Sequence, residues 1–445
     1  MSGEEAGLPG AGDVAERMRR LQQLGVQRGR AGFQPPRPAP PVPLPTASAN
    51  PLDLATHTGA RAVLTPAGVC LVASTQYPLD ETRGGWALAD TLMVSGDALA
   101  ACGRDPALAA YDFRQAAFLD TETSGLAGGA GTFAFMVGIG VFDDVYTVHQ
   151  VFMRTPAEEG ALLHVVSDLL APRRLLVTFN GRSFDAPLLQ TRFALQRAPS
   201  PLAGLAHLDL LTAARQRWRL RLPSCALSAL EQDILGFQRS QEDVPGWLIP
   251  SIYQEFARSQ AQPRPEVVAD VARVFYHNRE DIVNMVPLAA ALCAPFAAAG
   301  DWLPDRSFHP ADWVSVARCY EELEWLPACE AAYHRALAAP LAPELRTVAL
   351  RRLGDLLKRQ ERRAEAALIW QDWITSVPGL DITPFEELAK HHEWHDPDLA
   401  AARKWTLWGM HTARQLSSSF AREQALTALQ HRLERLERKL AGADA

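Results

Sequence analysis

Hydrophobic positions between residues 116 and 210 form short runs of apolar and β-branched residues, each bounded by Gly or Asp. Such runs are typical of buried strands. The predicted strands cover residues 116–120, 133–142, 146–153, 174–179 and 205–210, and amphipathic helices are predicted over residues 157–170 and from residue 183. Three strands in a meander, followed by helix, strand, helix and strand, predict an α/β domain with a mixed five-stranded sheet and flanking helices.

The segments around this pattern are predicted to be organised differently. Residues 1–55 include a tract from Pro35 to Pro51 that is rich in Pro and Ala. It favours extended polyproline II and cannot form a core, so a disordered tail that serves as a linker is predicted. Residues 56–115 alternate short apolar runs with turns and are predicted to be a β-rich lead-in. The α/β domain itself is predicted to span residues 116–300, closed by helices after residue 225.

Past residue 304 the strand signals disappear and a set of packing positions repeats. The first set recurs 37 residues later (366 − 329 = 37) and then more loosely, as Tyr320, Cys329, Tyr333 and Ala336; Leu357, Ala366, Trp370 and Trp373; His392, Ala401, Trp405 and Trp408. A small residue followed four positions later by an aromatic one is typical of tetratricopeptide-like helix pairs. We therefore predict an all-α repeat domain over residues 305–445 that ends in a capping helix. An ordinary helical bundle is the alternative.

Composition and charge narrow the functional classes. The formal net charge of −7 argues against a protein that coats nucleic acid through bulk positive charge, so phosphate binding would need local patches or bound cations. The six cysteines form no Cys-x-x-Cys pair and are expected to be reduced core residues of a cytoplasmic protein. No basic start followed by an apolar core, and no run of about 18 apolar residues, is present, so neither export nor a membrane span is expected.

The strongest chemical signal is the segment Phe118-Leu119-Asp120-Thr121-Glu122, where a predicted strand ends in two carboxylates. Residues two apart in a strand point to the same face, so Asp120 and Glu122 share one side of the sheet. Like charges placed this way repel each other unless a cation lies between them. The pair therefore indicates a metal site, although an isolated Asp-x-Glu on a solvated strand end would carry little weight.

Two later motifs supply further carboxylates. Asp185 follows the fourth predicted strand at a helix start, and Asp281 lies on a late helix four residues after His277, so that the two share a helical face. The ordered set Asp120, Glu122, Asp185 and Asp281 resembles the exonuclease motifs of the DEDD superfamily. Within it, the sequence is most similar to YprB-type ribonuclease H-like proteins, in which tetratricopeptide repeats follow the exonuclease domain. The resemblance covers roughly residues 60–410.

The resemblance implies a ribonuclease H-like 3′–5′ exonuclease with two divalent cations, Mg²⁺ or Mn²⁺. It implies that Asp120 contacts both ions and that Glu122, Asp185 and Asp281 complete the ligand set. His277 or Tyr276 would assist the attacking water. His277 is favoured because it shares the helical face of Asp281, and its ordinary pKa lies close to neutral pH.

The same resemblance places nucleic-acid contacts around the carboxylates, at Thr121, Thr123, Gly125, Leu126, Asn180 and Phe184. Phe184 is expected either to stack on a base or to belong to the core. Asp209 is predicted to cap the helix that follows it. Two arginine-rich stretches, over residues 192–221 and 346–363, are candidate basic patches or solvated helix faces.

The expected partner is nucleic acid, either DNA or RNA, bound at single-stranded 3′ ends. A protein partner is also expected to bind the repeat domain. Two other functions remain open from the sequence. One is a structure-selective endonuclease, because a fold does not decide polarity. The other is a repeat scaffold that binds nucleic acid without cleaving it.

Overall fold

A computed structural model describes residues 54–125, 131–240, 243–259, 263–297 and 308–443. Nearly all of the predicted Pro-rich tail, the nucleic-acid candidate Leu126 and the predicted boundary near residue 304 lie outside these ranges. The first helix among the described residues is α2 (Leu54–Thr58).

The central element is a seven-stranded sheet in the order β1-β2-β7-β6-β5-β8-β9. Its strands, in sequence order, are β1 (Arg61–Thr65), β2 (Gly68–Tyr77), β5 (Ala116–Thr123), β6 (Ala134–Phe142), β7 (Tyr146–Phe152), β8 (Leu175–Thr178) and β9 (Ala206–Asp209). The strands from β1 to β5 in this order pair antiparallel, whereas β5, β8 and β9 are parallel to one another. This confirms the predicted mixed sheet with flanking helices.

The sheet has two more strands than predicted. All five predicted strands are present, and none of their ends shifts by more than three residues. The additional strands β1 and β2 come from residues 61–77 and continue the sheet, because β2 pairs with β7 from Leu71 to Tyr77. The apolar runs within residues 61–77 are short. For this reason the sequence alone predicted a β-rich lead-in and did not assign these strands to the sheet.

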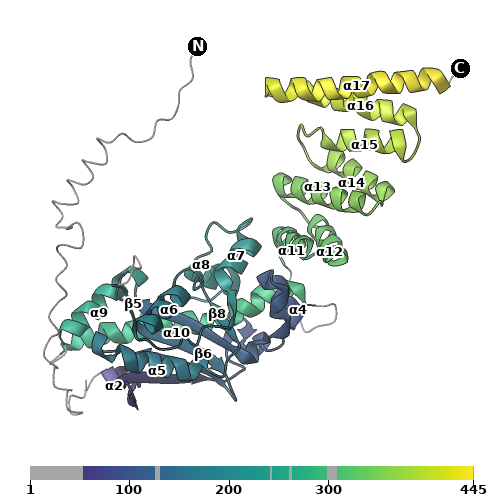
Figure 1. The fold of residues 1–445 in the computed structure, drawn as a ribbon. Helices are drawn as coiled ribbons and strands as arrows, with labels where there is room; N and C mark the ends of the chain where they lie inside the picture. The colour runs from purple at the N-terminus through teal and green to yellow at the C-terminus, as the bar shows by residue number, and fades with distance from the viewer. Residues whose placement is uncertain (1–53, 126–130, 241–242, 260–262, 298–307, 444–445) are drawn as a thin grey trace, which may run out of the picture. The chain divides into compact units, whose positions relative to one another are not determined.

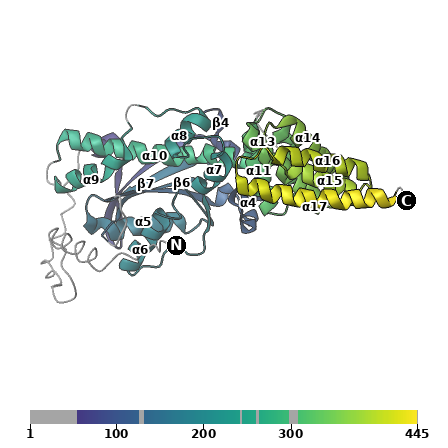
Figure 2. The same ribbon diagram turned by 90° about the horizontal axis from the view of Figure 1, so that it is seen from above.

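Helices cover both faces of the sheet. Ala116 and Phe118 pack into one core, and Ala117 and Leu119 pack into the other, as alternation along β5 requires. The first core is shared with α4 (Gly96–Gly103), α7 (Leu210–Trp218) and the second half of α10 (Pro265–Cys293), and the second core with α5 (Glu159–Leu170), α6 (Asp185–Leu195), α9 (Ile249–Arg258) and the first half of α10. Figure 2 shows β6 and β7 between α10 and α5.

Two glycines of β6 determine how closely α10 approaches the sheet. A Cβ at Gly138 would overlap the side chains of Asn278 and Ile282. A Cβ at Gly140 would overlap Tyr146 and Ile282 in the same way. Because only glycine leaves room here, α10 can lie directly against the strand that pairs with β5. This close contact brings residues of α10 to the end of β5.

The C-terminal region consists of consecutive helices, each packed on the next. They are α11 (Pro310–Glu322), α12 (Leu326–Leu337), α13 (Pro343–Arg359), α14 (Arg363–Ser376), α15 (Thr383–Trp394), α16 (Leu399–Ala413) and α17 (Ser419–Ala443). Figure 1 shows them following one another from α11 to α17. The remaining short elements are β3 (Thr82–Arg83), β4 (Trp86–Ala87), α3 (Leu88–Thr91) and α8 (Leu227–Leu230).

The repeated packing positions hold in two helix pairs and shift in the third. All eight predicted positions of the first two sets are buried. In α16, however, the buried positions are Ala402, Thr406 and Gly409, which lie 36 residues after their counterparts in α14 (402 − 366 = 36), and Trp408 is 45% exposed. The predicted third set is therefore wrong by one residue. The large aromatic residues suggested the register, but smaller neighbours make the contact.

The arginine-rich stretch over residues 346–363 is neutralised by neighbouring acids. Each of its seven cations forms an ion pair, and the pairs are Arg346–Asp372, Arg351–Asp381, Arg352–Glu321, Lys358–Glu387, Arg359–Glu321, Arg362–Glu330 and Arg363–Glu361. Six of the seven connect different helices or their flanking turns. These cations hold the helices together and do not form a free basic patch.

All six cysteines are unpaired, as predicted, and five of them are buried. Among the described helices, none is long and apolar enough to cross a membrane.

Candidate active site

Asp120 and Glu122 lie at the end of β5, on the face that α10 covers. Their backbone partners on β6 are Gly138 and Met136, and the register shifts after Glu122. Glu122 is buried, whereas Asp120 is partly exposed. The sheet thus delivers two carboxylates to one edge, as the alternation along the strand predicted.

Asp185 reaches the same edge from the first residue of α6. The Thr121 hydroxyl donates a hydrogen bond to Asp185 Oδ1 at 2.5 Å. The turn before α6 is possible because Asn180 adopts a left-handed conformation (φ 68°), which Asn tolerates better than most residues. The backbone amides of Asn180 and Arg182 donate to Asp209, at 2.9 and 3.1 Å.

Asp209 has the capping role that the sequence predicted. Its carboxylate accepts the Leu211 amide at 3.0 Å at the start of α7. It therefore connects the end of β9 to the turn that presents Asp185, and it is not a further metal ligand candidate.

Helix α10 supplies His277, Asn278 and Asp281. Asn278 is fully buried and donates from Nδ2 to Asp120 Oδ2 at 2.9 Å. Gln150 of β7 donates to the Asn278 carbonyl oxygen at 3.1 Å, which fixes the orientation of the amide. A buried amide held at both ends positions Asp120 relative to the helix that carries Asp281.

A segment after residue 236 places an arginine next to Asp281. The Arg239 guanidinium donates to Asp281 and binds Glu231 with Nη2 to Oε1 at 2.5 Å. Asn284 donates to the same Glu231 oxygen at 2.9 Å. The side chains of Arg239 and Glu231 are 9% and 2% exposed, so this is a buried ion pair that shares its cation with Asp281.

His277 is oriented by a carboxylate from the same segment. Its Nδ1 lies 2.7 Å from Asp243 Oδ1, and its Nε2 lies 3.7 Å from Asp281 Oδ2. With Nδ1 engaged by Asp243, Nε2 is the nitrogen that faces the carboxylates. Tyr276 points elsewhere, because its hydroxyl accepts the Ser240 amide at 3.0 Å.

The carboxylates disfavour one another's charge. Burial, followed by the negative charges of Asp281, Glu122 and Asp185, raises the pKa of Asp120 well above its usual range. Burial also raises the pKa of Glu122 to about 7 and that of Asp185 to about 6. The Thr121 hydrogen bond opposes the rise at Asp185. Each carboxylate would be stabilised by a nearby cation.

The pKa of His277 is also raised, but for a histidine this shift favours the charged form. Burial lowers its pKa, but the hydrogen bond to Asp243 and the negative charges of Asp281 and Glu122 outweigh burial and raise the pKa to about 9. The sequence placed its titration near neutral pH from the ordinary value for histidine. In the metal-free protein, Asp243, Asp281 and Glu122 hold the pKa of the ring above that ordinary value.

The donor set fits a hard divalent cation, since carboxylate oxygens are the ligands that Mg²⁺ and Mn²⁺ prefer. The side chains are not closed around one point. Among the described residues, no three of these four carboxylates have oxygen atoms that all lie within 4.8 Å of one another. Asn278, Thr121 and Arg239 hold Asp120, Asp185 and Asp281 instead. Cation binding therefore requires the side chains to close in.

The other predicted contact residues surround this edge. Phe184 is 58% exposed and precedes α6, so the expectation of a core residue is wrong and its ring is accessible. The Thr123 hydroxyl donates to the Gly125 carbonyl at 2.9 Å and shapes the turn after β5. Of the arginines over residues 192–221, Arg197, Arg215 and Arg219 are exposed.

The others in that stretch have acidic or carbonyl partners. Arg192 pairs with Glu159, and both Arg217 and Arg221 bind Asp312 of α11. Only part of the predicted basic patch is therefore available to a ligand.

Sequence reasoning missed Asn278, Arg239, Asp243 and Glu231. Asn278 directly follows His277 in the third motif and could have been noticed there. The other three lie outside the motifs, and only the tertiary structure brings them to Asp281 and His277.

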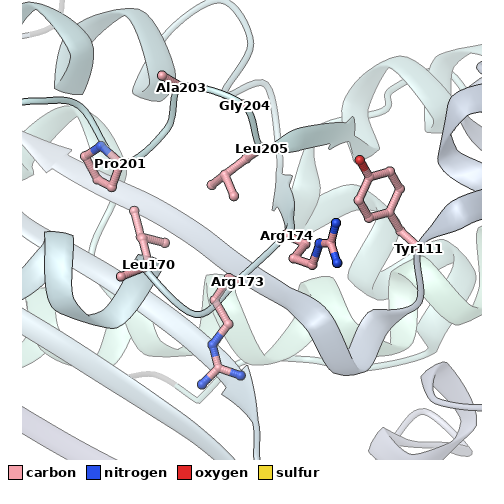
Figure 3. Close-up of a pocket in the computed structure, with 9 residues that line it drawn as sticks. Tyr111, Leu170, Arg173, Arg174, Pro201, Ala203, Gly204 and Leu205 are labelled. Atoms are coloured by element: carbon pink, nitrogen blue, oxygen red, sulfur yellow. The ribbon is translucent and has the colours of Figure 1, made fainter.

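A cavity of about 270 Å³ lies at the other end of the strands, where β8 and β9 begin (Figure 3). It is lined by residues that precede β8 and β9, including Arg174 and Leu205, together with Tyr111 and Leu170. None of the candidate site residues lines it. The carboxylate site is therefore separate from this cavity.

We expect Arg239→Met to lower the free energy of unfolding by about 3 kcal/mol, because it leaves the buried Glu231 carboxylate without its cation. Urea unfolding at pH 7 measures this change. Arg264→Met is the matched control: its partner Glu255 is exposed, so we expect a loss below about 1 kcal/mol. Adding Glu231→Gln to Arg239→Met should restore part of the stability. Equal losses in Arg239→Met and Arg264→Met would contradict the buried pair.

Comparisons with known proteins support a ribonuclease H-like α/β domain. Residues 117–293 match the model of the RNase H superfamily, a range that contains Asp120, Glu122, Asp185, His277 and Asp281. Over 388 residues the chain is 29% identical to uncharacterized protein YprB of Bacillus subtilis (strain 168). The aligned region covers 83% of this chain and 86% of that protein. The superfamily match suggests a nuclease that binds nucleic acid and uses divalent metal ions.

Proposed function

We propose that the protein is a metal-dependent 3′–5′ exonuclease that hydrolyses phosphodiester bonds of nucleic acid. The observation that carries the proposal is the meeting of Asp120, Glu122, Asp185 and Asp281 at one end of β5, where burial and the charges of the other three raise the pKa of Asp120. A non-cleaving scaffold would have no need to keep four mutually repelling carboxylates together. Their presence therefore favours catalysis over binding alone.

In this proposal Asp120, Glu122, Asp185 and Asp281 hold two Mg²⁺ or Mn²⁺ ions. The bound ions would supply positive charge to the attacking water and the departing oxygen. The protein's own contribution is positioning: Asn278 fixes Asp120, and Thr121 fixes Asp185. Asp281 must exchange part of its contact with Arg239 for a metal ligand role.

We assign His277 to the attacking water. Asp243 engages Nδ1, so Nε2 faces the carboxylates and is the atom that would accept or hold a proton there. Tyr276 is assigned a structural role, since its hydroxyl is occupied by the Ser240 amide. The exposed Phe184 ring supplies a surface on which a terminal base would stack.

We also propose that helices α11 to α16 form tetratricopeptide-like repeats that bind a protein partner. Support comes from the consecutive helix pairs and from the small and aromatic residues buried between them. Nucleic acid is a weaker candidate for this surface, because all seven cations over residues 346–363 are paired with acids. DNA and RNA remain equal candidates for the catalytic edge.

Strands labelled at the 5′ end, both DNA and RNA, test the polarity. With Mn²⁺ or Mg²⁺ the labelled products should shorten one nucleotide at a time and form a ladder. A structure-selective endonuclease would instead give a few fixed internal products from folded substrates. If labelled products of one discrete length dominate from the earliest time point, the exonuclease polarity is wrong.

A further inference from the structure

The turn between α15 and α16 brings two histidines and an aspartate together, far along the chain from the carboxylate motifs. His391 and His392 lie in the last turn of α15, and Asp396 follows the helix. The amides of Asp396 and Asp398 donate to the carbonyls of His391 and His392, at 3.0 and 2.9 Å. The Asp398 side chain also accepts the Ala401 amide at 2.8 Å at the start of α16. Both ends of the turn are therefore fixed by hydrogen bonds.

The three side chains converge on one point. Asp396 Oδ2 lies 3.4 Å from His392 Nδ1 and 4.0 Å from His391 Nε2. One ligand atom from each of the three residues lies within 4.8 Å of the others, and this is the only such group of three among the described residues. Two ligands of a tetrahedral ion at bond lengths near 2.1 Å are about 3.4 Å apart. The His392–Asp396 pair already has this separation, and the His391–Asp396 pair must shorten by about 0.6 Å. The ligand atoms of the two histidines lie within 4.8 Å of each other.

Burial gives a second, independent indication. His392 Nδ1, the nitrogen that faces Asp396, has no hydrogen-bond partner among the described residues. His391 is 7% exposed and faces Asp396 with Nε2, and its Nδ1 also lacks a partner there. Buried polar atoms in folded proteins are nearly always satisfied. His391 also lines a cavity of about 300 Å³ together with Trp370, Trp394 and His395.

We propose that His391, His392 and Asp396 bind one divalent transition-metal ion of the zinc class. Two imidazoles and one carboxylate select zinc-like ions, whereas Mg²⁺ prefers oxygen ligands alone. Asp396 is 66% exposed, so a fourth position remains open to water. The ion would fasten the end of α15 to the turn before α16. This site is separate in sequence and in ligand chemistry from the proposed catalytic carboxylates.

Zinc binding to the full chain, freed of metal by a chelator and kept in excess Mg²⁺, tests the proposal. Calorimetry should show one zinc ion per chain, and Co²⁺ should give the visible absorption of a site with nitrogen ligands. Asp396→Asn and His392→Gln should each weaken zinc binding at least tenfold. Zinc should raise the melting temperature of the wild type and leave that of both variants nearly unchanged.

Two controls locate the ion. His431→Gln changes an exposed histidine of α17 and should bind zinc like the wild type. Asp120→Asn should also retain zinc binding. Wild-type affinity in both Asp396→Asn and His392→Gln, confirmed as folded by circular dichroism, would overturn the proposal. It would equally be overturned if the wild type bound no zinc at 100-fold excess, or if Asp120→Asn alone abolished binding.

Discussion

Asp120→Asn is expected to reduce metal-dependent cleavage by roughly 10³-fold while making the metal-free protein more stable at pH 8. The loss follows because Asp120 is the carboxylate assigned to both ions. The gain follows because burial and the charges of Asp281, Glu122 and Asp185 raise the pKa of Asp120. An acid whose pKa is raised by folding costs stability above its ordinary pKa of about 4, where the unfolded chain ionises more easily.

The sign of the stability effect gives a pH test. In chelator, the advantage of Asp120→Asn should be largest at alkaline pH and disappear as the pH falls below about 4, where the wild-type carboxyl is protonated in both states. Adding Mn²⁺ at pH 8 should stabilise the wild type more than the variant. Asp168→Asn, at an exposed position of α5, should change neither activity nor stability. An active Asp120→Asn variant would remove the basis for the proposed function.

His277→Ala is expected to slow cleavage by roughly 10² to 10⁴-fold and to remove the low-pH limb of the rate profile. In the wild type, the rate should rise with pH as His277 loses its proton. Without metal its pKa is raised to about 9, partly by the charges of Asp281 and Glu122, and bound cations offset these charges, so the limb should lie below pH 9. Metal binding should be largely retained. Tyr276→Phe removes only the hydroxyl that accepts the Ser240 amide, so less than about a threefold change is expected.

Asp243→Asn tests whether His277 needs its contact with the Asp243 carboxylate, because the imidazole ring itself is retained. It keeps His277 but removes the charge that raises its pKa and leaves only a weaker, neutral hydrogen-bond acceptor, so the low-pH limb should move to lower pH. The same linkage applies to stability: a histidine whose pKa is raised by folding stabilises the fold most below pH 6.5, and this contribution is lost as pH rises through about 9. If Tyr276→Phe abolished cleavage while His277→Ala remained active, the roles assigned to His277 and Tyr276 would have to be exchanged.

Much of the catalytic domain was predictable because its signals are local. The alternation of Ala116, Ala117, Phe118 and Leu119 between two cores follows from the strand period, and the same period places Asp120 and Glu122 on one face. Helix periodicity likewise placed His277 and Asp281 together, and they lie 3.7 Å apart. Such features depend only on residues close in sequence.

What the sequence did not reveal depends on contacts between distant segments. Arg239 meets Asp281 from 42 residues away, and Asn278 meets Asp120 from 158 residues away. The raised pKa of His277 follows from Asp243, which no motif marked. In the helical region, Ala402 and Thr406 make the buried contacts of α16. Trp405 is only partly buried and Trp408 is 45% exposed, so these large aromatic residues gave a misleading signal for the register.

The central claim is tested most directly by digesting one single strand in two forms, linear and covalently circular, as both DNA and RNA. The account predicts that, with Mn²⁺ or Mg²⁺, the linear strand is shortened from its 3′ end and the circle stays intact, and that a chelator or Asp120→Asn stops the reaction. Nicking of the circle at a rate similar to that of the linear strand would contradict it, as would intact linear DNA and RNA under all of these conditions.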